Sequence, residues 1–79
     1  MQEEVAKRLL ELIKQKHLNM TKLARLSAVP PSTVKNIIYG VSKNTGIVTL
    51  KLLCDGMGIS IVEFFDTETF RTLEPEDID

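Results

Sequence analysis

Residues 20–40, MTKLARLSAVPPSTVKNIIYG, read as helical at both ends and carry two adjacent prolines, Pro30 and Pro31, near the middle. Proline is poorly tolerated inside a helix, because it lacks an N–H and its ring clashes with the preceding turn. It suits the first position of a helix, where no internal hydrogen bond is lost. The ring of Pro31 also biases Pro30 towards an extended conformation, which ends the earlier helix. The stretch therefore predicts two helices, about 20–27 and about 31–39, that meet at a corner.

Helix-start signals support this division. Asn19 is a favoured N-cap for the first of the two helices. Leu18 and Leu23 lie at the spacing of a hydrophobic staple across that cap, and Val29 and Val34 lie at the same spacing across the next start. Each signal is weak alone, and their agreement carries the prediction.

Apolar residues at helical spacing predict three more helices, at about 3–16, at about 46–57 and a short one after Ser60. Thr45 is expected to cap the second of these with its hydroxyl. Ser60 and Glu63 form an S-x-x-E capping box at the start of the third. The residues expected on buried faces are Leu9, Leu10 and Ile13 with Val5 and Ala6 as further candidates, then Leu23 and Ala24 with Leu26 as a further candidate, then Ile47, Leu50, Leu53, Cys54 and Met57.

Length and composition limit the classes of protein. The chain has 79 residues, enough for one domain. Its single cysteine, Cys54, excludes an intrachain disulfide, and with His17 as the one histidine it excludes a zinc site of several cysteines. Cys54 is interpreted as core and His17 as a cation at a helix end. The first 16 residues resemble neither a signal peptide nor a membrane span. We therefore expect a cytoplasmic protein without metal or cofactor.

The net charge of −1 conceals a strong segregation of charge. Residues 1–51 hold nine Lys or Arg and three Glu, a net +6, whereas residues 52–79 hold one Arg and eight acids, a net −7. Such asymmetry indicates a basic working part and an acidic end. We assign residues 1–65 to the folded domain and residues 66–79 to a short acidic tail.

Two short helices joined by a tight turn form a helix-turn-helix, and the chain over about residues 5–65 resembles the lambda-repressor-like (Cro/C1, XRE) family of DNA-binding domains. Two stretches carry the resemblance, LNMTKLARLSAVPPSTVKNIIYG (18–40) and SKNTGIVTLKLLCDGMGISIVEFF (42–65). The matching positions are the pair Leu23 and Ala24, Ala28 and Val29 at the turn, Thr33 and Val34, the closing Gly40, the run Met57 to Ser60, and Phe64 and Phe65.

Three positions depart from the family's usual pattern. Met20 stands where the family often has a glutamine that holds a phosphate. Ala28 replaces a common turn glycine, so a left-handed conformation there is mildly strained. Pro31 occupies a position that is often polar. The sequence specificity of relatives therefore does not transfer to this chain.

The resemblance implies an all-α, five-helix domain. Its third helix in chain order, about 31–39, is expected to enter the major groove, where each base pair shows a distinct pattern of donors and acceptors. With Val34 and Ile37 expected to face the core, the base-reading candidates are Pro31, Ser32, Thr33, Lys35 and Asn36. Helix capping is the alternative role for Ser32 and Thr33. Phosphates of the DNA backbone are expected to contact the start of the helix at about 20–27 and, as the resemblance implies, the loop after Gly40. The phosphate-contacting candidates are Thr21, Lys22, Arg25, Tyr39, Lys43 and Asn44.

The leading hypothesis is a small bacterial or phage transcriptional regulator, a repressor, that binds double-stranded operator DNA sequence-specifically. A homodimer is expected, because one such domain makes few contacts. The candidate dimer contacts are Phe64, Phe65, Phe70 and Leu73, with a core role the alternative for Phe64 and Phe65 and docking on the domain itself the alternative for Phe70 and Leu73.

A competing hypothesis is a protein-interaction module, such as an antitoxin, in which the acidic tail binds a protein partner. The sequence contains no supported Ser-His-Asp set, Gly-rich phosphate loop or framed carboxylate pair, so we expect no enzymatic activity.

Overall fold

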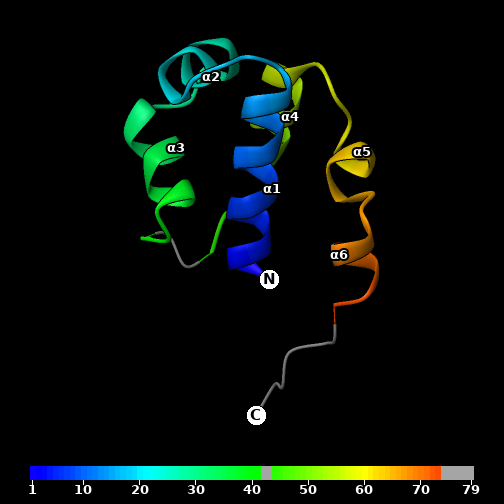
Figure 1. Ribbon diagram of the computed structural model, residues 1–79. Coiled ribbons are helices and arrows are strands. Elements are labelled where there is room, and N and C mark those ends of the chain that lie inside the picture. Colours follow the sequence, from blue (N-terminus) through cyan, green and yellow to red (C-terminus); the bar gives the residue numbers. More distant parts are fainter. Residues whose placement is uncertain (42–43, 74–79) are drawn as a thin grey trace.

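The computed structural model describes residues 1–41 and 44–73 of the chain. All regular structure in these residues is helical (Figure 1). The helices are α1 (Gln2–Gln15), α2 (Met20–Ser27), α3 (Pro31–Ile38), α4 (Ile47–Met57), α5 (Ile61–Phe65) and α6 (Glu68–Arg71). The predicted all-α class is therefore confirmed, and α1 to α4 begin and end within one residue of their predicted bounds. Helix α6 is additional to the five predicted helices.

The helices close around one hydrophobic core. In Figure 1, α1 runs through the middle of the molecule with α3 on one side, α2 near its C-terminal end, and α5 and α6 on the other side. Both α2 and α3 lie towards the outside of this arrangement, which leaves one face of each helix open to solvent. The largest fully buried side chains are Phe64, Leu9, Leu23, Ile37, Leu53, Val34 and Cys54.

Three expectations about buried faces are wrong. Leu10, Leu26 and Ile47 are 38%, 53% and 63% exposed, whereas Leu12 and Ser27 are buried. Successive helical residues point about 100° apart, so a side chain next to a buried one in sequence can face solvent. Residue type alone does not separate exposed Leu10 from buried Leu12, because burial depends on which side chain points at the neighbouring helix.

Side-chain caps define the starts of α2 and α5. Asn19 Oδ1 and Ser60 Oγ each accept a hydrogen bond from the backbone N–H three residues later, at 2.8 and 3.0 Å, so both predicted caps are confirmed. The predicted cap at Thr45 is wrong, because the N-cap residue of α4 is Gly46 and no side chain caps that helix. The hydroxyl of Thr45 instead accepts a hydrogen bond from the side chain of Gln2.

The corner between α2 and α3 is made by a left-handed residue followed by an extended one. Ala28 has φ 55 and ψ 38, as the sequence comparison with the family anticipates. The N–H of Val29 donates to the carbonyl of Ala24 at 3.0 Å, and the Val29 side chain is buried. Pro30, at φ −56 and ψ 139, then leads into α3, whose first residue is Pro31. The two prolines therefore start a helix rather than break one.

Arg8 of α1 fastens α5 to the domain. Its Nε donates to the carbonyl oxygen of Phe64 at 2.7 Å, and its Nη2 donates to that of Glu63 at 3.0 Å. Both carbonyls lie at the C-terminal end of α5, where a cation is favourable. Sequence spacing does not predict this contact, because the partners are more than fifty residues apart.

Helix α6 packs part of the predicted tail onto the domain. The ring centroid of Phe70 lies 4.8 Å from that of Phe65 and 6.2 Å from that of Phe64. Such separations are typical of attractive aromatic pairs. Residues 66–73 therefore belong with the folded domain, and the rest of the tail lies outside the described residues.

Helices α2 and α4 approach each other closely at Ser27 and Gly56. A Cβ added at Gly56 would lie 2.1 Å from Ser27 Oγ and 3.1 Å from Ser27 Cα. The Ser27 hydroxyl is buried, and it has no hydrogen-bond partner in the described part of the chain. Small residues at both positions thus allow the two helices to touch, at the cost of one unsatisfied hydroxyl.

We expect Gly56→Ala to destabilise the protein by about 1–3 kcal/mol. The added methyl overpacks the contact, and the free-energy cost of overpacking exceeds the gain in helix propensity. Ser27→Ala should be neutral or stabilising by about 1 kcal/mol, because it removes an unsatisfied hydroxyl. Urea unfolding of both variants and of the double variant measures this. The double variant should recover part of the Gly56→Ala loss. A stabilising Gly56→Ala would contradict the close approach.

The buried thiol of Cys54 leads to a second prediction. Cys54 is fully buried, and burial together with the nearby Asp55 carboxylate raises its pKa above 9.0, against the smaller lowering effect of Lys51. We expect the folded protein to resist iodoacetamide at mildly alkaline pH, whereas the urea-unfolded chain reacts. Because the unfolded thiol ionises at lower pH than the folded one, the free energy of unfolding should decline as pH rises above about 9. Equal alkylation rates for the folded and unfolded chains would contradict the buried position.

Candidate nucleic-acid interface

Helix α3 presents a polar face to solvent. Val34 and Ile37 are 0% and 1% exposed, so the predicted inward face is confirmed. Of the five base-reading candidates, Thr33 is half-buried, and the other four are exposed. The exposed four are Pro31, Ser32, Lys35 and Asn36. The structure therefore brings them together on one short helix, and their contact with bases stays a prediction.

The start of α3 is stabilised by the backbone. The carbonyl oxygen of Pro30 accepts from the N–H of Thr33 at 2.9 Å and from the N–H of Val34 at 3.4 Å. No side chain makes a capping hydrogen bond to this helix. The capping role considered for Ser32 and Thr33 is thus wrong. The Ser32 hydroxyl lies exposed at the leading end of the helix.

The predicted phosphate contacts lie on both sides of α3 in the sequence. Thr21, Lys22 and Arg25 are exposed on α2, and Asn44 is exposed in the segment before α4. Tyr39, which follows the last residue of α3, is 62% exposed. Lys43, the remaining candidate, lies outside the described residues. The described candidates are all accessible, and their contacts with phosphate stay predictions.

The segment that contains α2 and α3 carries no acidic residue. Residues 12–54 hold seven Lys or Arg and no Asp or Glu. In the described residues, Lys22, Arg25 and Lys35 make no ion pair, whereas Lys51 is paired with Asp55. Cations without a protein partner keep their full attraction for phosphate, and such clusters raise the local concentration of polyanions. The electrostatics of α2 and α3 therefore favour nucleic acid despite the net charge of −1.

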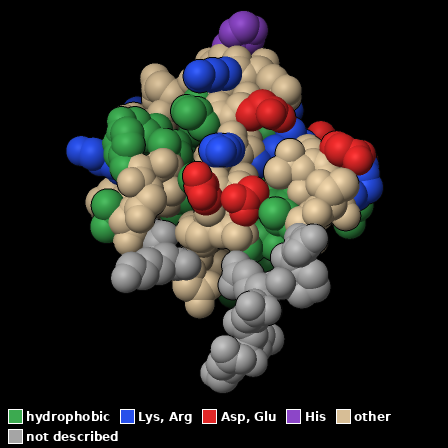
Figure 2. Space-filling view, turned by 60° about the horizontal axis from the view of Figure 1, so that its bottom comes forward, with side chains coloured by type: hydrophobic (Ala, Val, Ile, Leu, Met, Phe, Trp, Pro, Cys, Tyr) green, Lys and Arg blue, Asp and Glu red, His purple; other side chains and the backbone are tan. Residues whose placement is uncertain are grey.

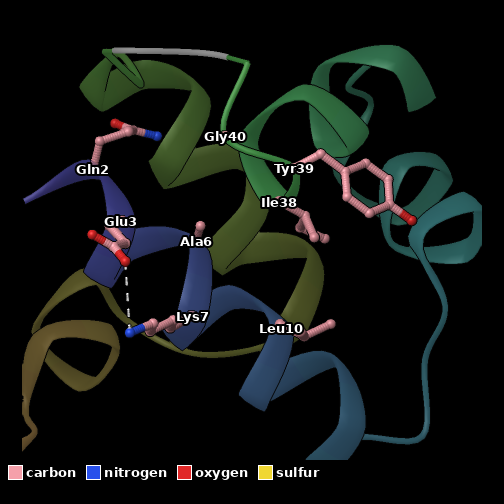
Figure 3. Close-up of a pocket in the computed structure, with 8 residues that line it drawn as sticks. All are labelled: Gln2, Glu3, Ala6, Lys7, Leu10, Ile38, Tyr39 and Gly40. Carbon is pink, nitrogen blue, oxygen red and sulfur yellow. Dashed lines mark ion pairs between the residues drawn. The ribbon is translucent and has the colours of Figure 1, made fainter.

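A groove with a cavity volume of about 540 Å³ lies between the first half of α1 and the C-terminal end of α3. Figure 3 shows Ala6, Leu10 and Ile38 along it and Tyr39 at one end. Figure 2 shows the face around the N-terminal end of α1, where hydrophobic side chains gather on one side and acidic and basic side chains are mixed. This mixed charge differs from the acid-free surface of α2 and α3, so we do not assign the groove to the candidate interface. Of the described residues that line the groove, Tyr39 is the one that is also a phosphate-contacting candidate.

Two other kinds of site receive no support. The described residues contain no group of three or more His, Cys, Asp and Glu side chains placed to hold a metal ion. None of the helices in the described residues is both long and apolar enough to cross a membrane.

An exposed polar helix that follows a tight turn, in a segment without acids, is the arrangement typical of a DNA-binding helix-turn-helix protein. The model of the helix-turn-helix family HTH_3 matches residues 9–64, which is well over half of the chain. The chain therefore belongs to the Cro/C1-type helix-turn-helix family of DNA-binding transcription regulators. Among curated proteins there is no match.

A solved structure supports the same assignment. The chain is similar to the protein in the "Crystal structure of the prophage Lp1 protein 11", with 35% sequence identity and a TM-score of 0.80. The match covers 91% of this chain and 95% of that chain. The likeness therefore extends over nearly the whole of both proteins.

We expect Lys22→Ala to weaken binding to every DNA duplex by a similar factor and to lower the slope of log affinity against log salt by about one, as the loss of one phosphate contact does. Fluorescence anisotropy on one duplex at several salt concentrations measures both. Lys51→Ala is the matched control, because Asp55 already pairs with that cation. A loss of affinity confined to one DNA sequence would assign Lys22 to base reading instead.

Proposed function

We propose that the protein is a sequence-specific repressor that reads the major groove of double-stranded operator DNA with α3. The observation that carries this proposal is the exposed polar face of α3 within a segment that holds seven cations and no acid. The turn and α2 would lie against the sugar–phosphate backbone of the DNA, as they do when the second helix of such a motif enters the major groove. The similarity to a prophage protein agrees with a bacterial or phage regulator, which would act in the cytoplasm.

Each exposed side chain of α3 has a distinct chemical use in the groove. The Asn36 amide can pair with both N6 and N7 of adenine, and the Lys35 ammonium can donate to O6 and N7 of guanine or to a phosphate. The Ser32 hydroxyl can donate to or accept from several bases. Pro31 offers only apolar contact, which suits a thymine methyl group. Thr33 is half-buried and therefore less accessible to base edges, so we assign it the smallest contribution to base reading.

A homodimer would let two copies of α3 read half-sites about one helical turn, roughly 34 Å, apart. Phe64 is fully buried and thus serves the core, which was the alternative role considered for it. Phe65, Phe70 and Leu73 are half-buried at the end of the domain that holds α5 and α6, and we propose them as dimer contacts.

The protein-interaction hypothesis has less support. Phe70 packs against the domain's own Phe64 and Phe65, so this part of the acidic tail belongs to the folded surface and is not a separate protein-binding segment. Binding to operator DNA would by itself exclude other proteins from the promoter, so repression needs no ligand.

We expect Asn36→Ala to lower affinity for the preferred sequence by about 1–3 kcal/mol and to relax the preference at one base pair. Lys35→Ala should either do the same at a guanine or weaken all sequences equally. The measurement is selection of bound duplexes from a random pool, followed by anisotropy at fixed salt. Asn44→Ala is the matched control, because a phosphate contact carries no base preference.

Two results would sink the proposal. One is the absence of binding at low salt to both random and genomic DNA. The other is an unchanged preferred sequence in both the Asn36→Ala and Lys35→Ala variants, which would show that α3 is not the reading helix.

A further inference from the structure

The first turn of α1 is joined to the segment that leads into α4 by a pair of hydrogen bonds. Gln2 Nε2 donates to Thr45 Oγ1 at 2.6 Å, and the backbone N–H of Thr45 donates to Gln2 Oε1 at 3.0 Å. Both residues are half-buried. Figure 3 shows the Gln2 side chain at the start of α1, directed towards the N-terminal end of α4. One amide thus holds both a backbone group and a side-chain group of one residue.

These two hydrogen bonds, which we call the Gln2–Thr45 clamp, determine how the chain enters α4. A threonine before a helix ordinarily accepts from the helix's own N–H groups. Here the Thr45 oxygen accepts from Gln2, and α4 begins one residue later, after Gly46 and without a side-chain cap. Because the Thr45 N–H donates to Gln2 Oε1, the position of the peptide bond between Asn44 and Thr45 is fixed by a residue of α1. The exposed Asn44 side chain therefore projects from a backbone whose position Gln2 sets.

Gln2 lines the same groove as Ile38, Tyr39 and Gly40 at the C-terminal end of the reading helix. Helix α3 has eight residues, so it is about 12 Å long, which is similar to the width of the major groove. A helix of that length in the groove places the chain that leaves it beside the phosphates at the groove's edge. Asn44 lies six residues after the last residue of α3, in the part of the chain without acids. An amide there can donate to a phosphate oxygen.

We propose that Gln2 is a positioning residue for DNA binding, which holds Asn44 against a backbone phosphate by clamping Thr45. The inference rests on the proposed DNA-binding function and adds a residue of α1, outside the helix-turn-helix, to its machinery. Gln2 itself does not contact DNA in this proposal. Its effect passes through the fixed backbone at Thr45.

The test uses the full chain and a random-sequence DNA duplex about three helical turns long, because a phosphate contact needs no operator. We expect Gln2→Ala to weaken binding by up to about ten- to hundredfold, the range expected for one hydrogen bond to a charged group. It should leave the salt slope unchanged, because the neutral Asn44 amide displaces no counterion. Asn44→Ala should do the same, and the double variant should be no weaker than either single variant, because both changes remove one shared contact.

Two controls separate positioning from general stability. Gln15→Ala alters the same residue type, exposed in the last turn of α1, and should bind like the unmodified protein. Circular dichroism at the assay temperature should show every variant fully folded, so that a loss of affinity does not reflect unfolding. Thr45→Val removes the hydroxyl and keeps the backbone N–H, and it should show a smaller loss than Gln2→Ala.

Unchanged affinity in folded Gln2→Ala would overturn the proposal, as would losses in Gln2→Ala and Asn44→Ala that multiply in the double variant. In both cases the unmodified protein still binds the duplex, so the DNA-binding function stands. Failure of the unmodified protein to bind at low salt would overturn the function and this inference together.

Discussion

The reading surface depends on one reversal of the chain after α2. Ala28 makes that reversal in the left-handed conformation, which costs a residue with a Cβ about 1–2 kcal/mol. The hydrogen bond from the Val29 N–H to the Ala24 carbonyl and the burial of the Val29 side chain offset this cost. Pro30 and Pro31 then allow few backbone conformations, so the direction of α3 relative to α2 is set by residues with little freedom.

A fixed corner positions α3 only if α2 is itself fixed. The close approach of Ser27 and Gly56 holds the C-terminal end of α2 against α4, immediately before the corner. Val34 and Ile37 anchor α3 in the core on the side opposite its polar face. The exposed side chains of α3 can therefore be presented in one arrangement, which lowers the entropy lost when DNA is bound.

The sequence predicts those parts of the structure that arise from local chemistry. Caps at Asn19 and Ser60, the helix start at Pro31 and the polar face of α3 depend on residues within one or two turns of each other. Contacts between distant segments are different, because no local spacing reports them. Arg8 at the end of α5, the clamp from Gln2 to Thr45 and the Ser27–Gly56 contact all belong to this second kind. The misplaced burial of Leu10, Leu26 and Ile47 has the same origin, since a neighbouring helix decides which side chain is covered.

The segregation of charge acquires a physical meaning in the fold. Among the described residues, most acids of α1, α4 and the α5–α6 end, though not Glu63, are paired with cations of those same regions: Glu3 with Lys7, Glu4 with the N-terminal ammonium, Glu11 with Arg8, Asp55 with Lys51, and Asp66 and Glu68 with Arg71. These pairs weaken any competing positive surface there. The cations of α2 and α3, like Lys14 and Lys16 at the end of α1, have no such partners in the described residues, so the attraction for a polyanion is concentrated in the acid-free part of the chain that includes α3. A chain with a net charge of −1 can thus direct DNA to one surface, because orientation depends on the local field rather than on the total charge.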